Sequence, residues 1–326
     1  MGPIGGDRVS GDLGAGDPVT GRIERDGIGT SWLDWGGDGP AVVLLHPNGF
    51  CAGVYDPLAR RLAFRHRVVG IDLRGHGASD DVVESALLGN DAMALDVLAV
   101  ADHLGLDRFA LIGVSFGGGV GIEVAAVAPE RVAALVLCEA IAIEAEAREQ
   151  QHFGYRNGPD GGDHPLAVGA RRRRDVWDDR EAVLVSYGSR PPMDQLAPEA
   201  LAGYVRWGFR DRPDGSVELA CRPETEAQIF GSVDRHGPVQ AFDALRLVAA
   251  EGRVPTAVMA GSRTDLDPEW FRAQAAALGV YLQLIDGGHF CLLEDTARAE
   301  QLVGTALAGM GHGRPLVAGR EHEEMK

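Results

Sequence analysis

A serine, a histidine and two acids that could together perform hydrolysis are spread along this chain. The serine lies in Gly113-Val114-Ser115-Phe116-Gly117, between a strand-like apolar run and a helical stretch. A G-x-S-x-G sequence in a strand–turn–helix context presents the serine hydroxyl at the top of a sheet. Glycines are expected on both sides because larger side chains would collide in so sharp a turn. The sequence therefore predicts that Ser115 is a nucleophile.

A serine hydroxyl is a weak nucleophile until a base removes its proton. His289 is the expected base because it follows the last strand-like run on a Gly-Gly loop, from which it can reach over the sheet. Asp265 follows the preceding strand-like run and is the expected acid that orients the imidazole. Glu139, directly after another apolar run, is the reserve candidate, and Asp265 could instead cap the next helix, a role that Asp267 suits better.

The oxyanion of a tetrahedral intermediate needs hydrogen-bond donors. The backbone N–H of Phe116, the residue after the nucleophile, is the expected first donor. The second is expected from the loop that follows the first buried strand, at residues 46–50. Pro47 has no N–H, so Asn48 is the preferred second donor, with Gly49 next.

The glycines at 117–119 and 121 could also suggest a dinucleotide-binding loop. That fingerprint requires G-x-G-x-x-G early in the fold, followed by an acid near the end of the next strand. Here the glycines follow a serine inside a predicted helix, after two strands and their helices. The sequence therefore favours the hydrolytic interpretation over nucleotide binding.

Composition excludes several functional classes. The net charge is −17, which disfavours nucleic acid and anionic membranes as partners. Lys326, the last residue, is the only lysine, so a phosphate-loop NTPase or a pyridoxal Schiff base cannot be built. The basic run at 171–174 is interpreted as a solvated helix face, with a carboxylate contact as the alternative. The four cysteines have no zinc spacing, and no metal or organic cofactor is expected.

Continuous apolar runs alternate with amphipathic helical stretches, which predicts a parallel sheet covered by helices on both faces. The predicted strands are Ala41–Leu45, Val68–Ile71, Phe109–Val114, Ala133–Leu137, Thr256–Ala260 and Tyr281–Ile285. The predicted helices are Asp56–Ala63, Asp91–Leu104, Phe116–Val127, Pro268–Leu278 and Leu292–Leu307.

The domain organisation follows from where this alternation stops. Residues 1–20 are expected to be a disordered tail, and 313–326 a C-terminal tail. Residues 21–140 and 239–312 should form the core, and 141–238 an inserted, mostly helical cap. No signal peptide or membrane span is predicted, so a soluble cytoplasmic enzyme is expected.

The assembled motifs resemble the α/β-hydrolase superfamily, and specifically its cap-bearing serine hydrolases. They include GIDLRGHGASD at 70–80, LIGVSFGG at 111–118, AGSRTDL at 260–266 and GGHF at 287–290. The resemblance implies an α/β fold with a mostly parallel, eight-stranded type of sheet and a structural role for His76. His46-Pro47 departs from the usual His-Gly of the oxyanion loop. Ser115 excludes the mechanism of relatives that use an aspartate nucleophile.

Hydrolysis of a carboxylic ester, lactone or related acyl bond of a small molecule is the expected activity. Carbon–carbon bond hydrolysis, perhydrolysis or haloperoxidase-like chemistry could use the same triad, and a binding protein on the same fold is a further alternative. Phe50 and Trp207 are expected to contact substrate, although aromatic residues such as Tyr204, Trp207 and Phe209 could instead form the core of the cap. The sequence identifies neither the substrate nor the oligomeric state.

Overall fold

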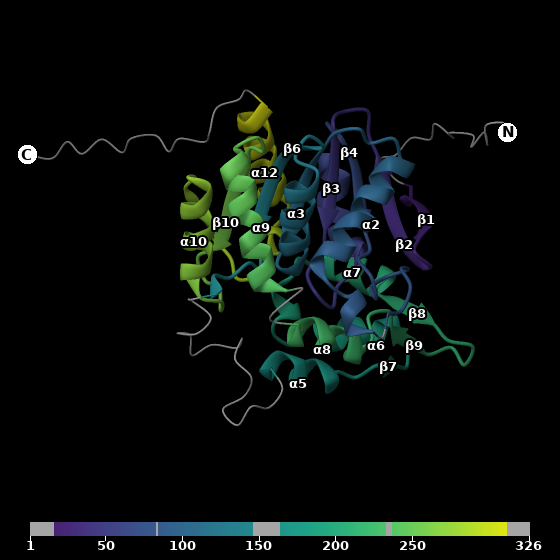
Figure 1. Ribbon diagram of the computed structural model, residues 1–326. Coiled ribbons are helices and arrows are strands. Elements are labelled where there is room, and N and C mark those ends of the chain that lie inside the picture. Colours follow the sequence, from purple (N-terminus) through teal and green to yellow (C-terminus); the bar gives the residue numbers. More distant parts are fainter. Residues whose placement is uncertain (1–15, 83, 146–163, 233–236, 312–326) are drawn as a thin grey trace, which may run out of the picture.

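The computed structural model describes residues 16–82, 84–145, 164–232 and 237–311. They form an eight-stranded sheet, helices on both of its faces, and a smaller layer at one end of the sheet (Figure 1). Most of the predicted N-terminal tail and all of the predicted C-terminal tail lie outside the described residues. Within these ranges, no helix is both long and apolar enough to cross a bilayer.

The sheet has the strand order β1-β2-β4-β3-β5-β6-β10-β11. Only β1–β2 and β2–β4 pair antiparallel, and the other neighbours are parallel, as the sequence predicted. The strands are β1 (Val19–Arg25), β2 (Ile28–Gly36), β3 (Ala41–Leu45), β4 (Arg67–Ile71), β5 (Phe109–Val114), β6 (Val132–Cys138), β10 (Thr256–Gly261) and β11 (Leu282–Ile285). The predicted strands match six of these within two residues. The hairpin of β1 and β2 was not predicted, and β1 begins inside the segment predicted to be a tail.

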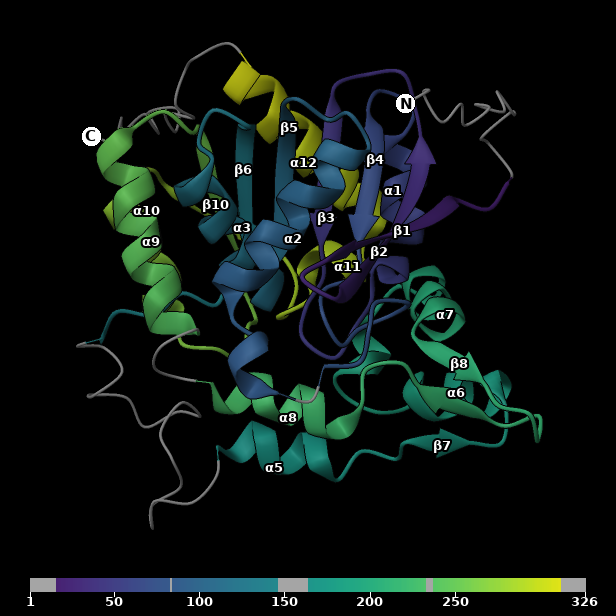
Figure 2. The same ribbon diagram turned by 45° about the vertical axis from the view of Figure 1, so that its right-hand side comes forward.

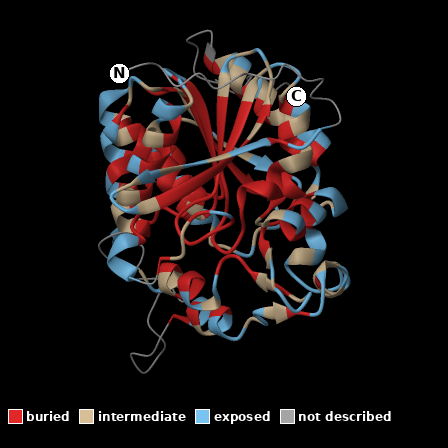
Figure 3. Cartoon of the chain, turned by 90° about the vertical axis from the view of Figure 1, so that its right-hand side faces the viewer, coloured by how far each residue is buried: buried red, intermediate tan, exposed pale blue. Residues whose placement is uncertain are grey.

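Helices cover both faces of the sheet (Figure 2). One face carries α2 (Asn90–His103), α3 (Phe116–Val127), α9 (Pro238–Glu251) and α10 (Pro268–Leu278), and the other carries α1 (Asp56–Leu62), α11 (Cys291–Glu294) and α12 (Thr296–Gly311). Alternate strand residues supply the two cores: Val43 packs in the first and Val42 in the second. The buried strands lie between these two layers in Figure 3. Burial on both faces explains why the strands are continuous apolar runs.

The smaller layer lies between β6 and α9 in the chain, within the segment predicted as a cap. It contains mostly helices, together with a three-stranded antiparallel sheet in the order β7-β9-β8 that was not predicted. Its elements are α5 (Pro165–Arg171), β7 (Val176–Trp177), α6 (Arg180–Tyr187), η3 (Met193–Gln195), α7 (Pro198–Trp207), β8 (Phe209–Asp211), β9 (Val217–Leu219) and α8 (Pro223–Gly231). Helix α7 packs on η1 (Ala52–Tyr55), a short helix of the core.

Candidate active site

Ser115 occupies a strained turn between β5 and α3. Its φ and ψ are 55° and −121°, a conformation that a residue with a side chain rarely adopts. A Cβ on Gly113 would lie 2.6 Å from Gly118 Cα, and one on Gly117 would lie 2.8 Å from the His46 carbonyl oxygen. Both glycines are therefore required for this close approach of backbones. The turn exposes only 7% of Ser115, which lines one cavity together with Ile229 and Phe230 of the smaller layer.

His289 lies against Ser115 on the loop that follows β11. Its Nε2 is 3.0 Å from Ser115 Oγ, and its Nδ1 is 3.0 Å from Glu139 Oε2. Because the carboxylate can only accept, Nδ1 carries the proton and Nε2 is left to accept from the serine hydroxyl. Backbone hydrogen bonds from Ser262 to Ile285 and from Arg263 to Gly287 fasten this loop to the end of β10. The imidazole is thus held between a hydroxyl and an acid.

The acid in contact with His289 is Glu139, which corrects the prediction of Asp265. Glu139 follows β6 directly, has φ 52° and is fully buried. Its Oε1 accepts the Gly261 N–H at 2.7 Å, and its Oε2 accepts the Thr264 hydroxyl at 2.6 Å. Asp265 is exposed beside this cluster. The loop after β10 therefore donates hydrogen bonds to the acid and does not supply it.

The two expected oxyanion donors have free N–H groups. Among the described residues, neither the Phe116 N–H nor the Asn48 N–H has a hydrogen-bond partner. The Gly49 N–H, the next candidate, donates to His76 Nε2 at 3.0 Å and is occupied. Asn48, Ser115 and Phe116 also line one cavity. The geometry therefore favours Asn48 over Gly49 as the second donor.

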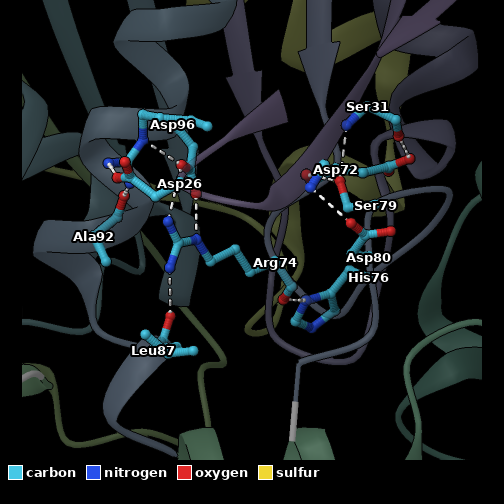
Figure 4. Close-up of polar contacts among 12 residues, drawn as sticks. Asp26, Ser31, Asp72, Arg74, His76, Ser79, Asp80, Leu87, Ala92 and Asp96 are labelled. Carbon is cyan, nitrogen blue, oxygen red and sulfur yellow. Dashed lines mark hydrogen bonds and ion pairs between the residues drawn. The ribbon is translucent and has the colours of Figure 1, made fainter. Parts of the chain in front are cut away.

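Two buried histidines hold the loop at 46–50 without carrying charge. His76 donates from Nδ1 to the Arg74 carbonyl, and His46 accepts the Leu73 N–H at Nε2 (Figure 4 shows His76). Burial lowers the pKa of His46 to about 4, and burial together with His46 lowers that of His76 to about 3. Both rings are therefore neutral at physiological pH, and His76 can accept from Gly49. His76 is structural, as the resemblance implied.

The loop that contains His76 is fixed by two buried carboxylates (Figure 4). Asp72 accepts the Ala52 N–H at 2.7 Å and the Ser31 hydroxyl at 2.8 Å. Arg74 pairs with Asp96 on α2, where both side chains are 3% exposed. Charge-assisted hydrogen bonds therefore hold this turn in place, and the Arg74–Asp96 pair also fastens α2 to it.

A second set of polar contacts ties the loop at 46–50 to the smaller layer. Arg173 pairs with Glu226 and donates to the hydroxyls of Tyr204, at 3.0 Å, and Tyr187. Burial raises the pKa of Tyr204, whose hydroxyl therefore stays protonated and donates to the Gly49 carbonyl at 3.0 Å. Asn48 Nδ2 donates to the Glu226 carbonyl. Arg173 therefore contacts a buried carboxylate. This was the alternative interpretation of the basic run at 171–174, which was otherwise expected to be a solvated helix face.

We expect Arg173→Met to lower stability by about 3 kcal/mol, because it leaves the buried Glu226 carboxylate unpaired. Activity should also fall, by about tenfold or more, because Tyr204 and Glu226, which hydrogen-bond to Gly49 and Asn48, lose their common partner Arg173. Chemical denaturation and ester kinetics measure the two effects.

Arg171→Met is the matched control, because Arg171 pairs with Glu224 from the same two segments but at an exposed site. Its stability should change by less than about 1 kcal/mol. Equal losses in the two variants would contradict a special role for Arg173.

Phe50 and Trp207, the two residues expected to contact substrate, lie near the site but outside the cavity wall. The Phe50 ring packs between those of Tyr204 and Phe290, each 5.0 Å away. Trp207 packs against Gly53 on η1, between the two layers. Both side chains are therefore packed against other residues of the protein. Direct contact with substrate remains a prediction for each.

The cavity beside Ser115 has a volume of about 40 Å³. Its wall is mostly apolar and contains no ionisable side chain among the described residues. The lining residues are Asn48, Leu88, Asn90, Ser115, Phe116, Ile141, Ile229, Phe230, Ser232, Gly237 and Pro238. Such a wall suits an uncharged group of a small molecule. In the described ranges, no three His, Cys, Asp or Glu side chains are grouped to hold a metal ion.

Comparison with known proteins gives both partial and nearly complete matches. A pimeloyl-[acyl-carrier protein] methyl ester esterase of Nitrosomonas europaea is 42% identical over 31% of this chain and 37% of its own. The chain thus spans only about a third of the length of such relatives. A putative non-heme haloperoxidase of Mycobacterium phage D29 is 27% identical over 83% of this chain and 88% of its own.

The fold comparison covers nearly the whole of the described structure. The enol-lactonase from Burkholderia xenovorans LB400 superposes with a TM-score of 0.64 at 21% identity, over 88% of this chain and all of that one. At this identity the likeness shows the fold alone. The sequence model of the alpha/beta hydrolase fold matches residues 40–296, which is most of the chain. With the eight-stranded sheet and the serine turn already described, the chain belongs to the α/β-hydrolase family.

Proposed function

We propose that this protein cleaves a carboxylic ester, lactone or related acyl bond through Ser115, His289 and Glu139. The observation that carries the proposal is the imidazole of His289, whose two nitrogens lie 3.0 Å from the serine hydroxyl and from a buried carboxylate. This is the geometry by which a base activates a hydroxyl and an acid orients the base.

In this mechanism, Ser115 Oγ attacks the substrate carbonyl while His289 Nε2 takes its proton. Glu139 accepts the Nδ1–H and stabilises the imidazolium that forms. The free N–H groups of Phe116 and Asn48 hold the oxyanion, and the N-terminus of α3 adds its positive dipole end. His289 then returns the proton to the leaving group, and water releases the acid from the acyl-enzyme.

Labelling with a fluorophosphonate tests the nucleophile, because this reagent phosphonylates an activated serine. Mass spectrometry should locate one adduct per chain on the peptide that contains Ser115. Ser115→Ala should remain unlabelled while it melts at a temperature similar to that of the wild type. Labelling of the variant, or an unlabelled wild type, would contradict the assignment.

Stopped-flow release of p-nitrophenol from a short-chain ester tests the acyl-enzyme. A burst that approaches one equivalent per chain, followed by slower turnover, is expected if deacylation limits the rate. A linear trace would give no support for accumulation of the acyl-enzyme. Acid quench followed by mass spectrometry of the protein would then decide whether the acyl-enzyme forms at all.

Perhydrolysis is the second candidate, and the match to the putative haloperoxidase over 83% of this chain favours it. In that reaction, hydrogen peroxide takes the place of water and attacks the acyl-enzyme to give a peracid, which leaves Ser115 free. Peracid formation from an ester and peroxide, abolished in Ser115→Ala, would support it. Formation of the acid alone under the same conditions would exclude it.

A further inference from the structure

Asn90 is a buried amide in the wall of the cavity beside Ser115. It is the first residue of α2 and is 2% exposed. Its Oδ1 is fully buried, and the carboxamide makes no hydrogen bond to any residue that the structure describes. Buried polar groups in folded proteins are almost always paired, because a missing hydrogen bond leaves the cost of removing the group from water unrecovered.

The other polar side chains of the cavity wall all have partners. Ser115 Oγ is paired with His289, and Asn48 Nδ2 donates to the Glu226 carbonyl. The Ser232 hydroxyl donates to the Gln228 carbonyl. Among the described polar lining residues, Asn90 is therefore the one whose side chain makes no hydrogen bond.

Asn90 also differs from buried amides that hold the backbone together. Gln274 Nε2, for comparison, donates to two carbonyls, those of Ala140 and Ala142, in the segment that follows the triad acid. The Asn90 amide has no such contact, although Arg74 fixes its helix through Asp96. A rigidly placed and unpaired amide is typical of a group that orients a ligand.

The position of the cavity indicates which part of a substrate Asn90 faces. Phe116 and Asn48, whose N–H groups are the expected oxyanion donors, belong to its wall, whereas His289 does not. A leaving group must lie beside His289 to receive its proton. An acyl group on Ser115 would therefore direct its nearest atoms toward this cavity, where Leu88 and Ile141 provide apolar contacts.

We propose that Asn90 selects acyl groups that carry a hydroxyl, whose O–H donates to Asn90 Oδ1. The inference rests on the proposed acyl-transfer function and narrows its substrate class to esters of short, uncharged hydroxy acids. The apolar contacts that Leu88 and Ile141 offer beside Asn90 favour an uncharged acyl group. A site that pairs with a substrate hydroxyl rejects the analogue that lacks it, because its own polar group is then unpaired.

The test compares p-nitrophenyl esters of butanoic, 2-hydroxybutanoic and 3-hydroxybutanoic acids, which share a leaving group and a chain length. Wild type should hydrolyse one of the two hydroxy esters with a kcat/KM at least about tenfold above that for butanoate, after correction for the uncatalysed rates. Asn90→Leu, which is similar in shape and apolar, should remove this preference, so that its kcat/KM values for the hydroxy esters fall to about the value for butanoate.

Two further measurements separate recognition from a structural role. Asn90→Asp keeps an acceptor at the same place and should retain a preference for the hydroxy ester. Asn90→Leu should melt no lower than wild type, because it removes an unpaired amide; a lower melting temperature together with equal losses on all three esters would show that Asn90 is structural.

The outcomes also distinguish this inference from the proposed function. If fluorophosphonate labels Ser115 and butanoate is hydrolysed without any preference for a hydroxyl, only the role of Asn90 is wrong. If Ser115 is not labelled and none of the esters turns over, the proposed function itself fails.

Discussion

Glu139→Gln should lower kcat by about 10³- to 10⁴-fold, whereas Asp265→Asn should change it by less than about threefold. Removal of the charge on the orienting acid of a serine triad has an effect of this size, because the imidazole adopts the wrong tautomer. Both carboxylate oxygens of Glu139 accept hydrogen bonds, from Gly261, Thr264 and His289. The NH₂ group of a glutamine at 139 would therefore face one of these donors and could not accept its hydrogen bond. Steady-state ester kinetics measure the difference.

Two controls make this comparison decisive. Thermal unfolding of Glu139→Gln shows whether the loss of activity comes from misfolding. Thr264→Val removes one hydrogen bond to the acid while keeping its charge, and should reduce kcat by a smaller factor, about tenfold. A loss in Asp265→Asn as large as that in Glu139→Gln would restore Asp265 as the acid and contradict the structural assignment.

Gly117→Ala is the second substitution with a large expected effect. A methyl group here would overlap the Leu45 carbonyl and lie 2.8 Å from that of His46, at the start of the loop that holds Asn48. We expect a loss of about 3 kcal/mol or more in stability, because backbone cannot move aside as a flexible side chain can. Turnover should fall at least a hundredfold in the protein that still folds, because the donors at Asn48 and Phe116 are pushed apart.

Gly304→Ala is the matched control for this change. Gly304 lies in α12, and a Cβ there would have no atom within 4 Å. Alanine should therefore stabilise the helix by about 0.5–1 kcal/mol and leave kcat unchanged. Denaturant unfolding and ester kinetics on both variants check the pair. Similar behaviour of the two alanine variants would refute the close packing of the serine turn.

The parallel strands and the serine turn could be predicted from sequence because one physical cause determines each pattern. Burial on both faces produces continuous apolar runs, and the sharp turn at Ser115 demands small residues. The hairpin of β1 and β2 was not predicted because β1 is not buried on both faces. It is a largely exposed edge strand, and its residues give no continuous apolar run. The three short strands of the smaller layer are two or three residues long, too short for a periodic signal.

The acid could not be identified in the same way. Glu139 and Asp265 both follow parallel strands of the sheet, and both give the order serine, acid, histidine along the chain. What separates them is the backbone at Glu139, whose positive φ is unusual for a residue of this type and has no sequence signature. The sequence feature that pointed to Glu139 was its position directly after the apolar run of β6. This strand pairs with β5, which ends next to Ser115.

Arg173 and Asn90 were missed for a related reason. Their surroundings are assembled from segments far apart in the chain, as when Arg173 meets Glu226 and Tyr204. Within the sequence, Arg173 is one member of a basic run and Asn90 is a polar residue at a helix start. Only the folded arrangement shows that the first is half-buried against a carboxylate and that the second is enclosed and unpaired.

The hydrogen bonds from the smaller layer to Asn48 and Gly49 limit which replacements of that layer this protein can tolerate. The smaller layer supplies a carbonyl and a hydroxyl that hold Asn48, the proposed oxyanion donor, and Gly49. A chimera in which a foreign segment replaces this layer without equivalents of Arg173, Tyr204 and Glu226 should therefore lose turnover on every substrate, however well the new segment suits the ligand.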